Sequence, residues 1–233
     1  MPQAATRLPL IGEKAPAFTA NTTQGTIAFP DDYAGKWVVF FSHPADFTPV
    51  CTTEFMTVAS MQDEFRALNV ELLGLSIDSV FSHIAWLRTI NKIEYRGMRN
   101  LEVLFPVIAD LSMEVARAYG MLQETASTTQ AVRAVFIIDP QGMIRAMLYY
   151  PMANGRNIQE IKRLILALQE ADKYQVATPA NWEPGEEVII PPPGSCGAAR
   201  ERMEQAGEGY RCLDWFLCLR PDPEQAGKQE ATT

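Results

Sequence analysis

The stretch WVVFFSHPADFTPVCTTEF, Trp37–Phe55, joins an apolar run to a polar turn and then to a helical pattern. WVVFF is continuous in apolar residues and bounded by AGK and SHP, so it predicts a strand buried on both faces. Pro49 suits the first position of a helix, where its missing N–H does no harm. Cys51 then falls in the first helical turn, where free backbone N–H groups and the helix dipole favour a thiolate.

Outward from this stretch, strand and helix patterns alternate. VELLGLSID (Val70–Asp78) and VRAVFIID (Val132–Asp139) resemble WVVFF in character, and DPQG is a turn that makes MIRAMLYY a hairpin partner. Apolar residues at three-and-four spacing predict helices over 52–68, 79–90, 113–119 and 158–171. This alternation predicts an α/β sandwich around a mixed sheet flanked by helices.

The composition of the chain changes after about Tyr174. TPANWEPGEEVIIPPPG is rich in proline and has no helical period, which predicts an extended arm. A short helix over 198–206 and an aromatic-rich tail, YRCLDWFLC, follow. We therefore expect one domain over residues 1–173 and a C-terminal arm over residues 174–233. The arm has too little enclosed core to fold alone, so we expect it to pack on a second subunit as a dimerisation domain.

Composition and charge exclude several classes of protein. The 233 residues are 47% hydrophobic and 21% charged, which is typical of a globular protein with a full core. A net charge of −8 without any basic run argues against a nucleic-acid partner. No apolar window approaches the ~18 residues of a membrane span, and the N-terminus lacks a signal-peptide pattern. We expect no membrane association and a cytoplasmic location.

The four cysteines are Cys51, Cys196, Cys212 and Cys218. They are few and unevenly spaced, so a disulfide scaffold is not expected, and in a reducing compartment reactive or metal-bound thiols are more common. The alternative is that each is a small buried hydrophobic residue. Thr48, three residues before Cys51, has two alternatives as well: its hydroxyl caps the helix, or it donates to a bound ligand.

The segment PADFTPVC resembles the proline, threonine and cysteine motif of the peroxiredoxins, and its flanks resemble their one-cysteine subgroup. Similarity continues in VRAVFIIDPQGMIRAMLYYP, NGRN and ATPANWEPGEEVIIPPP, and covers roughly residues 9–218. The resemblance implies a thioredoxin-like fold and a thiol-specific peroxidase. Such an enzyme reduces hydrogen peroxide and organic hydroperoxides to water and alcohols through a cysteine sulfenic acid.

The resemblance also implies roles for residues of this chain. Cys51 would be the peroxidatic nucleophile, and Thr48 would orient peroxide and sulfur. Pro44 would shield the thiolate from water. Arg133 would place its guanidinium beside the thiolate and bind the peroxide, and Arg156 would help hold the pocket.

His43 matches the subgroup too; as a lone histidine beside a strand end, it is more typical of a structural hydrogen-bonding residue than of an acid or base. The tail resembles an archaeal and bacterial variant with C-terminal cysteines, which makes Cys218 the resolving thiol and Cys212 an alternative or a shuttle partner. Their C-x₅-C spacing is too wide for a CxxC motif and lacks a second pair for zinc. Cys196 has no assigned role, and we expect neither a metal nor a cofactor.

The resemblance implies partners as well: peroxides, a thioredoxin-like or small-thiol reductant, and a second subunit. We expect an intersubunit disulfide and a homodimer that closes into a decamer of five dimers. The alternative function is a redox-regulated chaperone or peroxide sensor that uses the same cysteine without rapid turnover. A disulfide reductase would need a CxxC motif, and the sequence around Cys51 carries no cysteine hydrolase signature.

Overall fold

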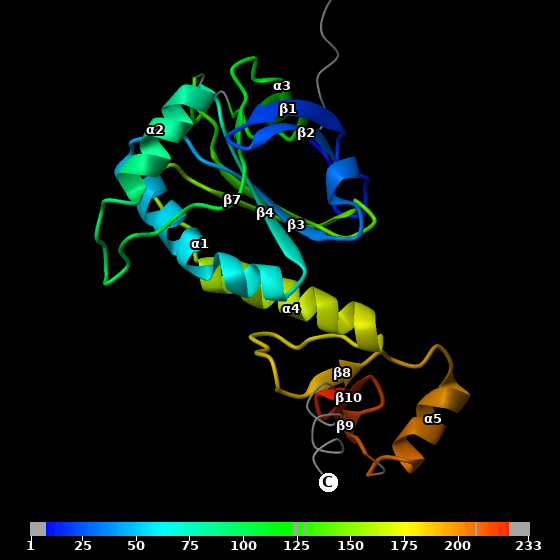
Figure 1. Ribbon diagram of the computed structural model, residues 1–233. Coiled ribbons are helices and arrows are strands. Elements are labelled where there is room, and N and C mark those ends of the chain that lie inside the picture. Colours follow the sequence, from blue (N-terminus) through cyan, green and yellow to red (C-terminus); the bar gives the residue numbers. More distant parts are fainter. Residues whose placement is uncertain (1–7, 124, 128, 208, 224–233) are drawn as a thin grey trace, which may run out of the picture. The chain divides into compact units, whose positions relative to one another are not determined.

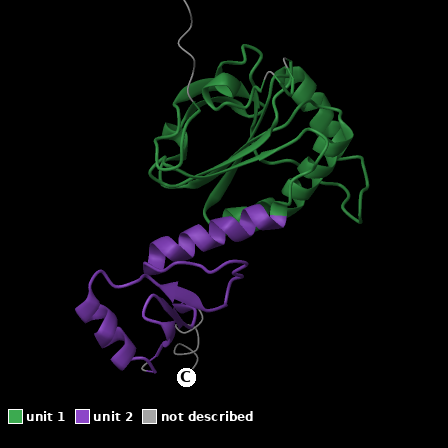
Figure 2. Ribbon diagram, turned by 180° about the vertical axis from the view of Figure 1, so that it is seen from behind, with its two compact units in different colours: residues 1–158 green, residues 159–233 purple. Residues whose placement is uncertain are grey.

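The computed structural model describes residues 8–123, 125–127, 129–207 and 209–223. The chain divides into two compact units, residues 1–158 and residues 159–233 (Figure 2). The domain boundary expected after residue 173 stays a prediction. The two expected domains begin and end in residues 1–7 and 224–233, which lie outside the described residues. Each unit is described below by itself.

The first unit contains a seven-stranded mixed sheet in the order β2-β1-β5-β4-β3-β6-β7 (Figure 1). β3 pairs in parallel with β4, and β4 with β5, whereas the remaining neighbours are antiparallel. The strands are β1 (Phe18–Thr22), β2 (Gly25–Phe29), β3 (Trp37–Ser42), β4 (Val70–Ser76), β5 (Val107–Ala109), β6 (Arg133–Ile138) and β7 (Ile144–Tyr150). The expected mixed sheet is thus confirmed.

The central strand β3 is buried along its whole length because its two faces carry different clusters. Phe40 packs edge-on against Tyr119, with ring centroids 4.8 Å apart, on one face. Phe41 packs against Phe55 of α1, with centroids 5.6 Å apart, on the other. This two-sided burial explains why WVVFF has no alternating polar residues.

Three helices and a 3-10 turn complete the first unit: η1 (Asp31–Tyr33), α1 (Pro49–Ala67), α2 (Val80–Ile90) and α3 (Glu114–Ala118). α1 begins at Pro49, in agreement with the preference of proline for the first helical position. α2 is capped by Ser79, whose hydroxyl accepts a hydrogen bond from the backbone N–H of Ser82. Contacts of α1 with β4 and of α2 with β5 hold both helices on the sheet.

The expected hairpin is formed by β6 and β7, which pair antiparallel from Arg133 opposite Tyr150 onward. In the DPQG turn the N–H of Gly142 donates to the carbonyl of Asp139 at 2.8 Å. Gly142 has a φ of 75°, a left-handed conformation that glycine adopts without steric cost. The turn therefore depends on glycine at this position, as its sequence indicates.

The second unit contains α4 (Ile158–Tyr174, whose first residue belongs to the first unit), α5 (Cys196–Glu204) and a three-stranded sheet. The sheet has the order β8-β10-β9, with β8 (Val188–Ile190), β9 (Arg211–Asp214) and β10 (Leu217–Arg220). The buried Trp182 packs with residues of α4 and β8 in a small apolar cluster. The segment expected to be an extended arm and tail therefore includes a short sheet. Among the described helices, none combines the length and apolarity that crossing a membrane requires.

Candidate active site

Cys51 lies in the first turn of α1, directly after the loop that leaves β3, and its side chain is fully buried. Thr48 is the residue before the helix, but its hydroxyl makes no capping hydrogen bond and donates instead to the carbonyl of Ala45 at 2.8 Å. Of the two alternatives for Thr48, side-chain capping is thus not observed. Pro44 is buried in the same loop.

Arg133 contacts the sulfur directly. Its Nη1 donates to Cys51 Sγ at 3.3 Å, and its Nε donates to the carbonyl of Met152 at 2.9 Å. Arg133 is the first residue of β6, and β6 pairs with β3. Because β3 leads into the loop before Cys51, this pairing places Arg133 near the start of α1. Arg133 Nη1 is therefore a buried hydrogen-bond donor held against the sulfur.

Glu54 joins the two arginines of the site, and sequence analysis did not identify it. One of its carboxylate oxygens, Oε2, accepts from Arg133 Nη1 and from Arg156 Nη2, each at 2.7 Å. Its other oxygen accepts from the backbone N–H and Nε of Arg156 at 2.8 and 2.9 Å. Glu54 follows Cys51 by three residues and therefore lies on the same side of α1. An acid at this spacing, within an otherwise apolar helix face, is the signal that could have identified it.

Arg156 has no contact with the sulfur among the described contacts; it bonds to the residues around it. Its Nη1 donates to the backbone carbonyls of Ser42 on β3 and Ala134 on β6, at 2.8 and 3.1 Å. Together with its bonds to Glu54, these contacts fix α1 and two strands around one guanidinium. The structure thus brings Cys51, Thr48, Pro44, Arg133 and Arg156 into one region of the first unit.

His43 lies at the end of β3 in a buried cluster with Asp46 and His83. Its Nε2 lies 3.0 Å from Asp46 Oδ1, and His83 Nδ1 lies 2.8 Å from Asp46 Oδ2. Burial lowers the pKa of His43 more than its hydrogen bond to the carboxylate of Asp46 raises it. Burial alone would raise the pKa of Asp46, but its hydrogen bonds with the two histidines hold it well below the ordinary range. The sequence pattern did not identify this cluster, because His83, which bonds to the same carboxylate of Asp46, is 40 residues from His43 on α2.

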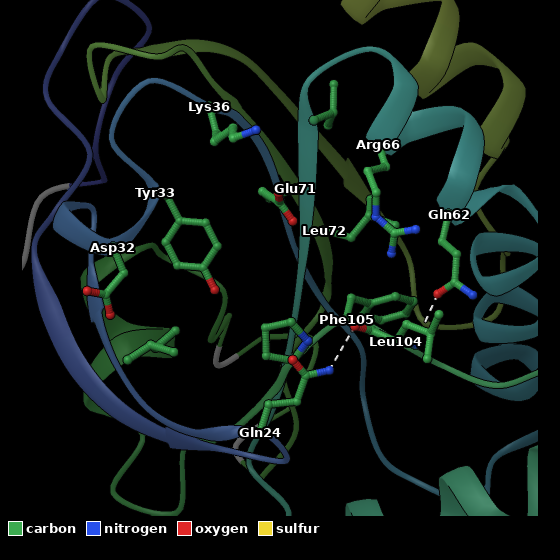
Figure 3. Close-up of a pocket in the computed structure, with 13 residues that line it drawn as sticks. Gln24, Asp32, Tyr33, Lys36, Gln62, Arg66, Glu71, Leu72, Leu104 and Phe105 are labelled. Atoms are coloured by element: carbon green, nitrogen blue, oxygen red, sulfur yellow. Dashed lines mark hydrogen bonds between the residues drawn. The ribbon is translucent and has the colours of Figure 1, made fainter.

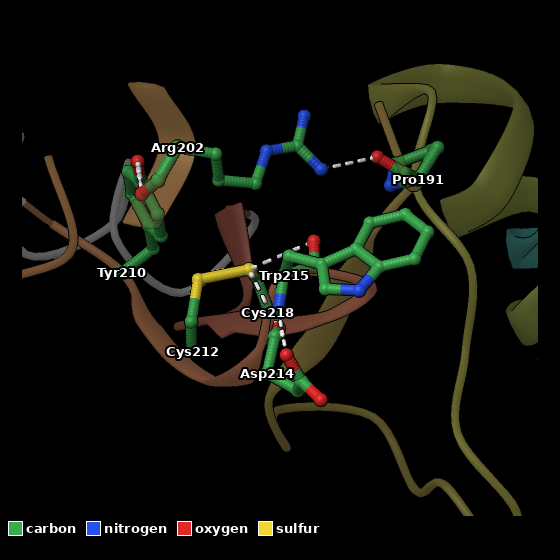
Figure 4. Close-up of a disulfide and its surroundings, with 7 residues drawn as sticks. All are labelled: Pro191, Arg202, Tyr210, Cys212, Asp214, Trp215 and Cys218. Carbon is green, nitrogen blue, oxygen red and sulfur yellow. Dashed lines mark hydrogen bonds between the residues drawn. A yellow bond between two sulfur atoms is a disulfide. The ribbon is translucent and has the colours of Figure 1, made fainter. Parts of the chain in front are cut away.

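The two C-terminal cysteines lie in the second unit and are joined by a disulfide (Figure 4). Cys212 on β9 and Cys218 on β10 are directly opposite in the antiparallel register, with Cα atoms 4.0 Å apart. Cys196 is a free, exposed thiol at the start of α5.

A separate hollow of about 340 Å³ opens near the other end of α1 (Figure 3). Tyr33, Gln62 and Arg66 are among the residues that line it, and Cys51 and Arg133 are not. Burial and the nearby carboxylates of Glu71 and Asp32 raise the pKa of Tyr33 to about 12. The hollow is therefore distinct from the thiol site.

A mixed sheet flanked by helices, with a buried thiol in the first turn of a helix and a guanidinium on its sulfur, defines a thioredoxin-like thiol enzyme. Residues 11–147 match the AhpC/TSA family, and residues 167–206 match the C-terminal domain of 1-Cys peroxiredoxin. The chain belongs to the peroxiredoxins and is a thiol peroxidase.

Individual relatives agree with this family. A peroxiredoxin of Methanosarcina mazei is 69% identical over 94% of this chain and all of its own, and one of Aquifex aeolicus is 52% identical over 91% and 97%. Among solved structures, the yeast mitochondrial 1-Cys peroxiredoxin superposes with a TM-score of 0.77 at 39% identity, over 92% of this chain and all of that chain. A cysteine-to-serine mutant of peroxiredoxin 6 from Arenicola marina gives 0.78 at 33% identity, over 92% and 99%.

Proposed function

We propose that Cys51 is the peroxidatic cysteine of this enzyme and that it reduces hydrogen peroxide and organic hydroperoxides. The observation that supports this assignment is the contact of Arg133 Nη1 with Cys51 Sγ at 3.3 Å inside a buried site. The sulfur attacks one peroxide oxygen, the O–O bond breaks, and the other oxygen leaves with the electron pair and takes up a proton. The products are a cysteine sulfenic acid and water or an alcohol.

In this proposal the main catalytic effect is stabilisation of the leaving oxygen, not ionisation of the thiol. Lowering the pKa of a thiol raises its thiolate fraction but lowers its nucleophilicity, so the net gain is only about a few-fold. A donor placed for charge that develops in the transition state is worth about 2.7–4 kcal/mol. The guanidinium of Arg133 and the backbone N–H of Cys51 are the donors placed for this role. The hydroxyl of Thr48 donates to the carbonyl of Ala45 in this structure and would turn toward a bound peroxide to serve as a third donor.

Two substitutions test the role of these donors. In Arg133→Ala and Thr48→Val, the rate constant for Cys51 oxidation is expected to fall by roughly 100-fold or more, well beyond any change in thiolate fraction. Stopped-flow tryptophan fluorescence gives the rate, and thiolate absorbance gives the ionised fraction. Arg66→Ala, an exposed position near the other end of α1, is the control and should match wild type. A rate that falls only in proportion to the thiolate fraction contradicts the proposal.

We further propose that Cys218 resolves the sulfenic acid. The Cys218 thiol displaces water from the sulfenic acid and forms a Cys51–Cys218 disulfide. Cys212 then attacks Cys218 Sγ and releases the Cys51 thiol, which leaves a Cys212–Cys218 disulfide. The bond between Cys212 and Cys218 supports such an exchange, because it corresponds to the last oxidised state of the scheme; the alternative order, in which Cys212 resolves and Cys218 exchanges, ends in the same bond.

The electrons that reopen that disulfide come from an external thiol, for which we propose thioredoxin or a similar donor. The glutathione/thioredoxin systems act in thiol resolution of the yeast relative, and this supports the choice. A steady-state assay with hydrogen peroxide and several reductants, on wild type, Cys51→Ser, Cys212→Ser and Cys218→Ser, tests the scheme. Cys51→Ser should be inactive. A wild-type protein that reacts once and does not turn over would instead be a peroxide sensor.

We also propose that the Cys51–Cys218 bond joins two subunits and that dimers assemble into a decamer. Two large aromatic side chains support a further contact surface: Phe47 is 57% exposed and Phe81 79% exposed. Phe47 directly follows Asp46, and Phe81 lies two residues before His83; Asp46 and His83 contact each other. If the two rings belong to one exposed apolar patch, that patch would be typical of an association surface. The cytoplasmic location stays a prediction.

A further inference from the structure

The cluster of His43, Asp46 and His83 has more contacts than its hydrogen-bonding groups can satisfy with both histidines neutral. All three side chains are at most 1% exposed. Asp46 Oδ1 lies 3.0 Å from His43 Nε2 and 3.1 Å from His83 Nδ1, and Asp46 Oδ2 lies 2.8 Å from His83 Nδ1. The other nitrogen of His83, Nε2, lies 3.1 Å from the backbone carbonyl of Ile108 on β5. This arrangement determines where the protons are.

Both ring nitrogens of His83 face acceptors. A backbone carbonyl carries no proton, so the contact with Ile108 requires a proton on Nε2 of His83. An ionised carboxylate carries none either, so the contact with Asp46 requires a proton on Nδ1. A neutral imidazole has only one N–H and would leave a lone pair facing an acceptor. Turning the ring by 180° would put carbon atoms at both positions.

His43 has the opposite arrangement. Its Nε2 donates to Asp46 Oδ1, whereas its Nδ1 is buried and has no hydrogen-bond partner among the described residues. A buried N–H without an acceptor is costly, so Nδ1 is best occupied by a lone pair. The two histidines, although both bonded to Asp46, therefore differ in charge.

We infer that His83 is a doubly protonated imidazolium paired with the Asp46 carboxylate, and that this pair positions His43 as the neutral Nε2–H tautomer with a bare Nδ1. His83 acts through Asp46 and does not touch Cys51, so it is a positioning residue on α2. The ring of His43 packs edge-on against Phe55, with centroids 4.8 Å apart, one turn beyond Cys51 on α1. The pair thus fixes an unoccupied hydrogen-bond acceptor beside the helix that carries the reactive sulfur.

The charges around the cluster are consistent with this assignment. The cation of His83 and the anion of Asp46 cancel inside the core, and the nearby guanidinium of Arg156 lowers the pKa of His43 further. The carboxylate of Asp78 is a further charged group at the cluster, and it accepts a hydrogen bond from the backbone N–H of Asp46 at 3.0 Å. A second positive charge on His43 would lie near both His83 and Arg156. Burial, the largest cause, and repulsion from both cations lower the pKa of His43 and keep it neutral.

A bound metal ion is the competing explanation for two histidine nitrogens that face one carboxylate. A zinc ion would lie about 2.0–2.2 Å from each ligand atom in tetrahedral geometry, which separates the ligand atoms by more than a hydrogen bond does. The separations of 2.8 and 3.0 Å are ordinary for N–H···O bonds. The observations therefore favour protons, and the experiment distinguishes the two.

The test is ¹⁵N NMR of the reduced full-length protein with labelled histidine, which is practical because the chain has only two histidines. At pH 7 we expect three protonated ring nitrogens and one bare nitrogen, and the bare one should disappear in His43→Asn. Two bare nitrogens would overturn the inference. So would a bare-nitrogen signal that shifts on addition of zinc and returns on addition of EDTA.

A substitution tests the positioning role, and this part rests on the proposed role of Cys51. In His83→Gln, the bare-nitrogen signal of His43 should divide between its two tautomers, and the rate of Cys51 oxidation should fall by about tenfold, as for loss of one hydrogen bond to a charged group. Arg88→Gln, exposed on the same helix, should leave both unchanged. An unchanged His43 spectrum in His83→Gln contradicts the inference. Because the spectrum does not depend on peroxidase activity, failure of the proposed function would be seen separately.

Discussion

Glu54 is the residue on which the buried charges of the active site depend. Its carboxylate accepts hydrogen bonds from Arg133 and Arg156, and all three side chains are at most 2% exposed. Glu54→Gln leaves two buried guanidiniums without an anion, so the free energy of unfolding is expected to fall by about 3–5 kcal/mol. Urea unfolding measures this change. Glu64→Gln, on the exposed face of the same helix, should shift stability by less than about 0.5 kcal/mol; an equal effect would contradict the argument.

His43 makes the stability of the fold depend on pH. Burial lowers its pKa in the folded state below 6.5, the value of a free histidine, so the unfolded chain binds the proton first as pH falls. The stabilisation is therefore present above pH 6.5 and is lost as pH falls toward the folded pKa. Between pH 7 and 5.5, wild type should lose about 1 kcal/mol more than His43→Asn, measured by urea unfolding. Parallel pH profiles for the two proteins would contradict this assignment.

At the residue scale, the local sequence was enough to predict that the thiol lies at a helix start. It was not enough to identify the buried charged residues around it. Pro49 and Cys51 are neighbours in sequence, so helix-start chemistry brings them together. The other residues of the site depend on contacts between segments that are far apart in sequence. Glu54 on α1 bonds to Arg156, and Asp46 in the loop after β3 bonds to His83 on α2. Such pairings depend on the order of strands in the sheet, which no local pattern reports.

Helix starts provide an internal comparison at the scale of the element. Cys51 lies in the first turn of α1 and Cys196 in the first turn of α5, but only Cys51 has a guanidinium on its sulfur among the described contacts. If the helix end alone activated a thiol, both would react alike. We expect hydrogen peroxide to oxidise Cys51 at least about 100-fold faster than Cys196, the size of a preplaced donor's effect.

Quenching with dimedone followed by peptide mass spectrometry measures both cysteines in one sample. Arg133→Ala provides the matched control, because it should reduce the difference between Cys51 and Cys196 without changing Cys196. Equal labelling of the two cysteines in wild type would show that the helix end is sufficient.

Elements were predictable where their pattern is long. The buried runs at β3, β4 and β6 and the helical periods of α1, α2 and α4 are each evident in the sequence, and the structure contains all of them. β5 and β8, with three residues each, are too short for a periodic pattern. β8 also lies in a proline-rich segment, where local composition favours an extended arm and its pairing with β10 is not visible.

For the whole molecule, the groups proposed for peroxide cleavage and the thiols proposed for recycling lie in different units. The contacts of Arg133 with Cys51 and Glu54, and of Glu54 with Arg156, lie within residues 1–158, whereas the Cys212–Cys218 disulfide lies within residues 159–233. The first unit thus contains the groups proposed to break the peroxide bond. The second contains the thiols proposed to reset the first.

This division predicts that the two half-reactions can be separated in the full-length chain. In Cys212→Ser/Cys218→Ser, the first oxidation of Cys51 should proceed within about twofold of the wild-type rate, since every transition-state contact is retained. Turnover with thioredoxin should be lost, and the sulfenic acid should advance to sulfinic acid under excess peroxide. Stopped-flow fluorescence and intact-mass spectrometry follow the two steps, with Cys196→Ser as the matched control that keeps both. If the double variant loses the first oxidation as well, the second unit contributes to peroxide cleavage and the division is wrong.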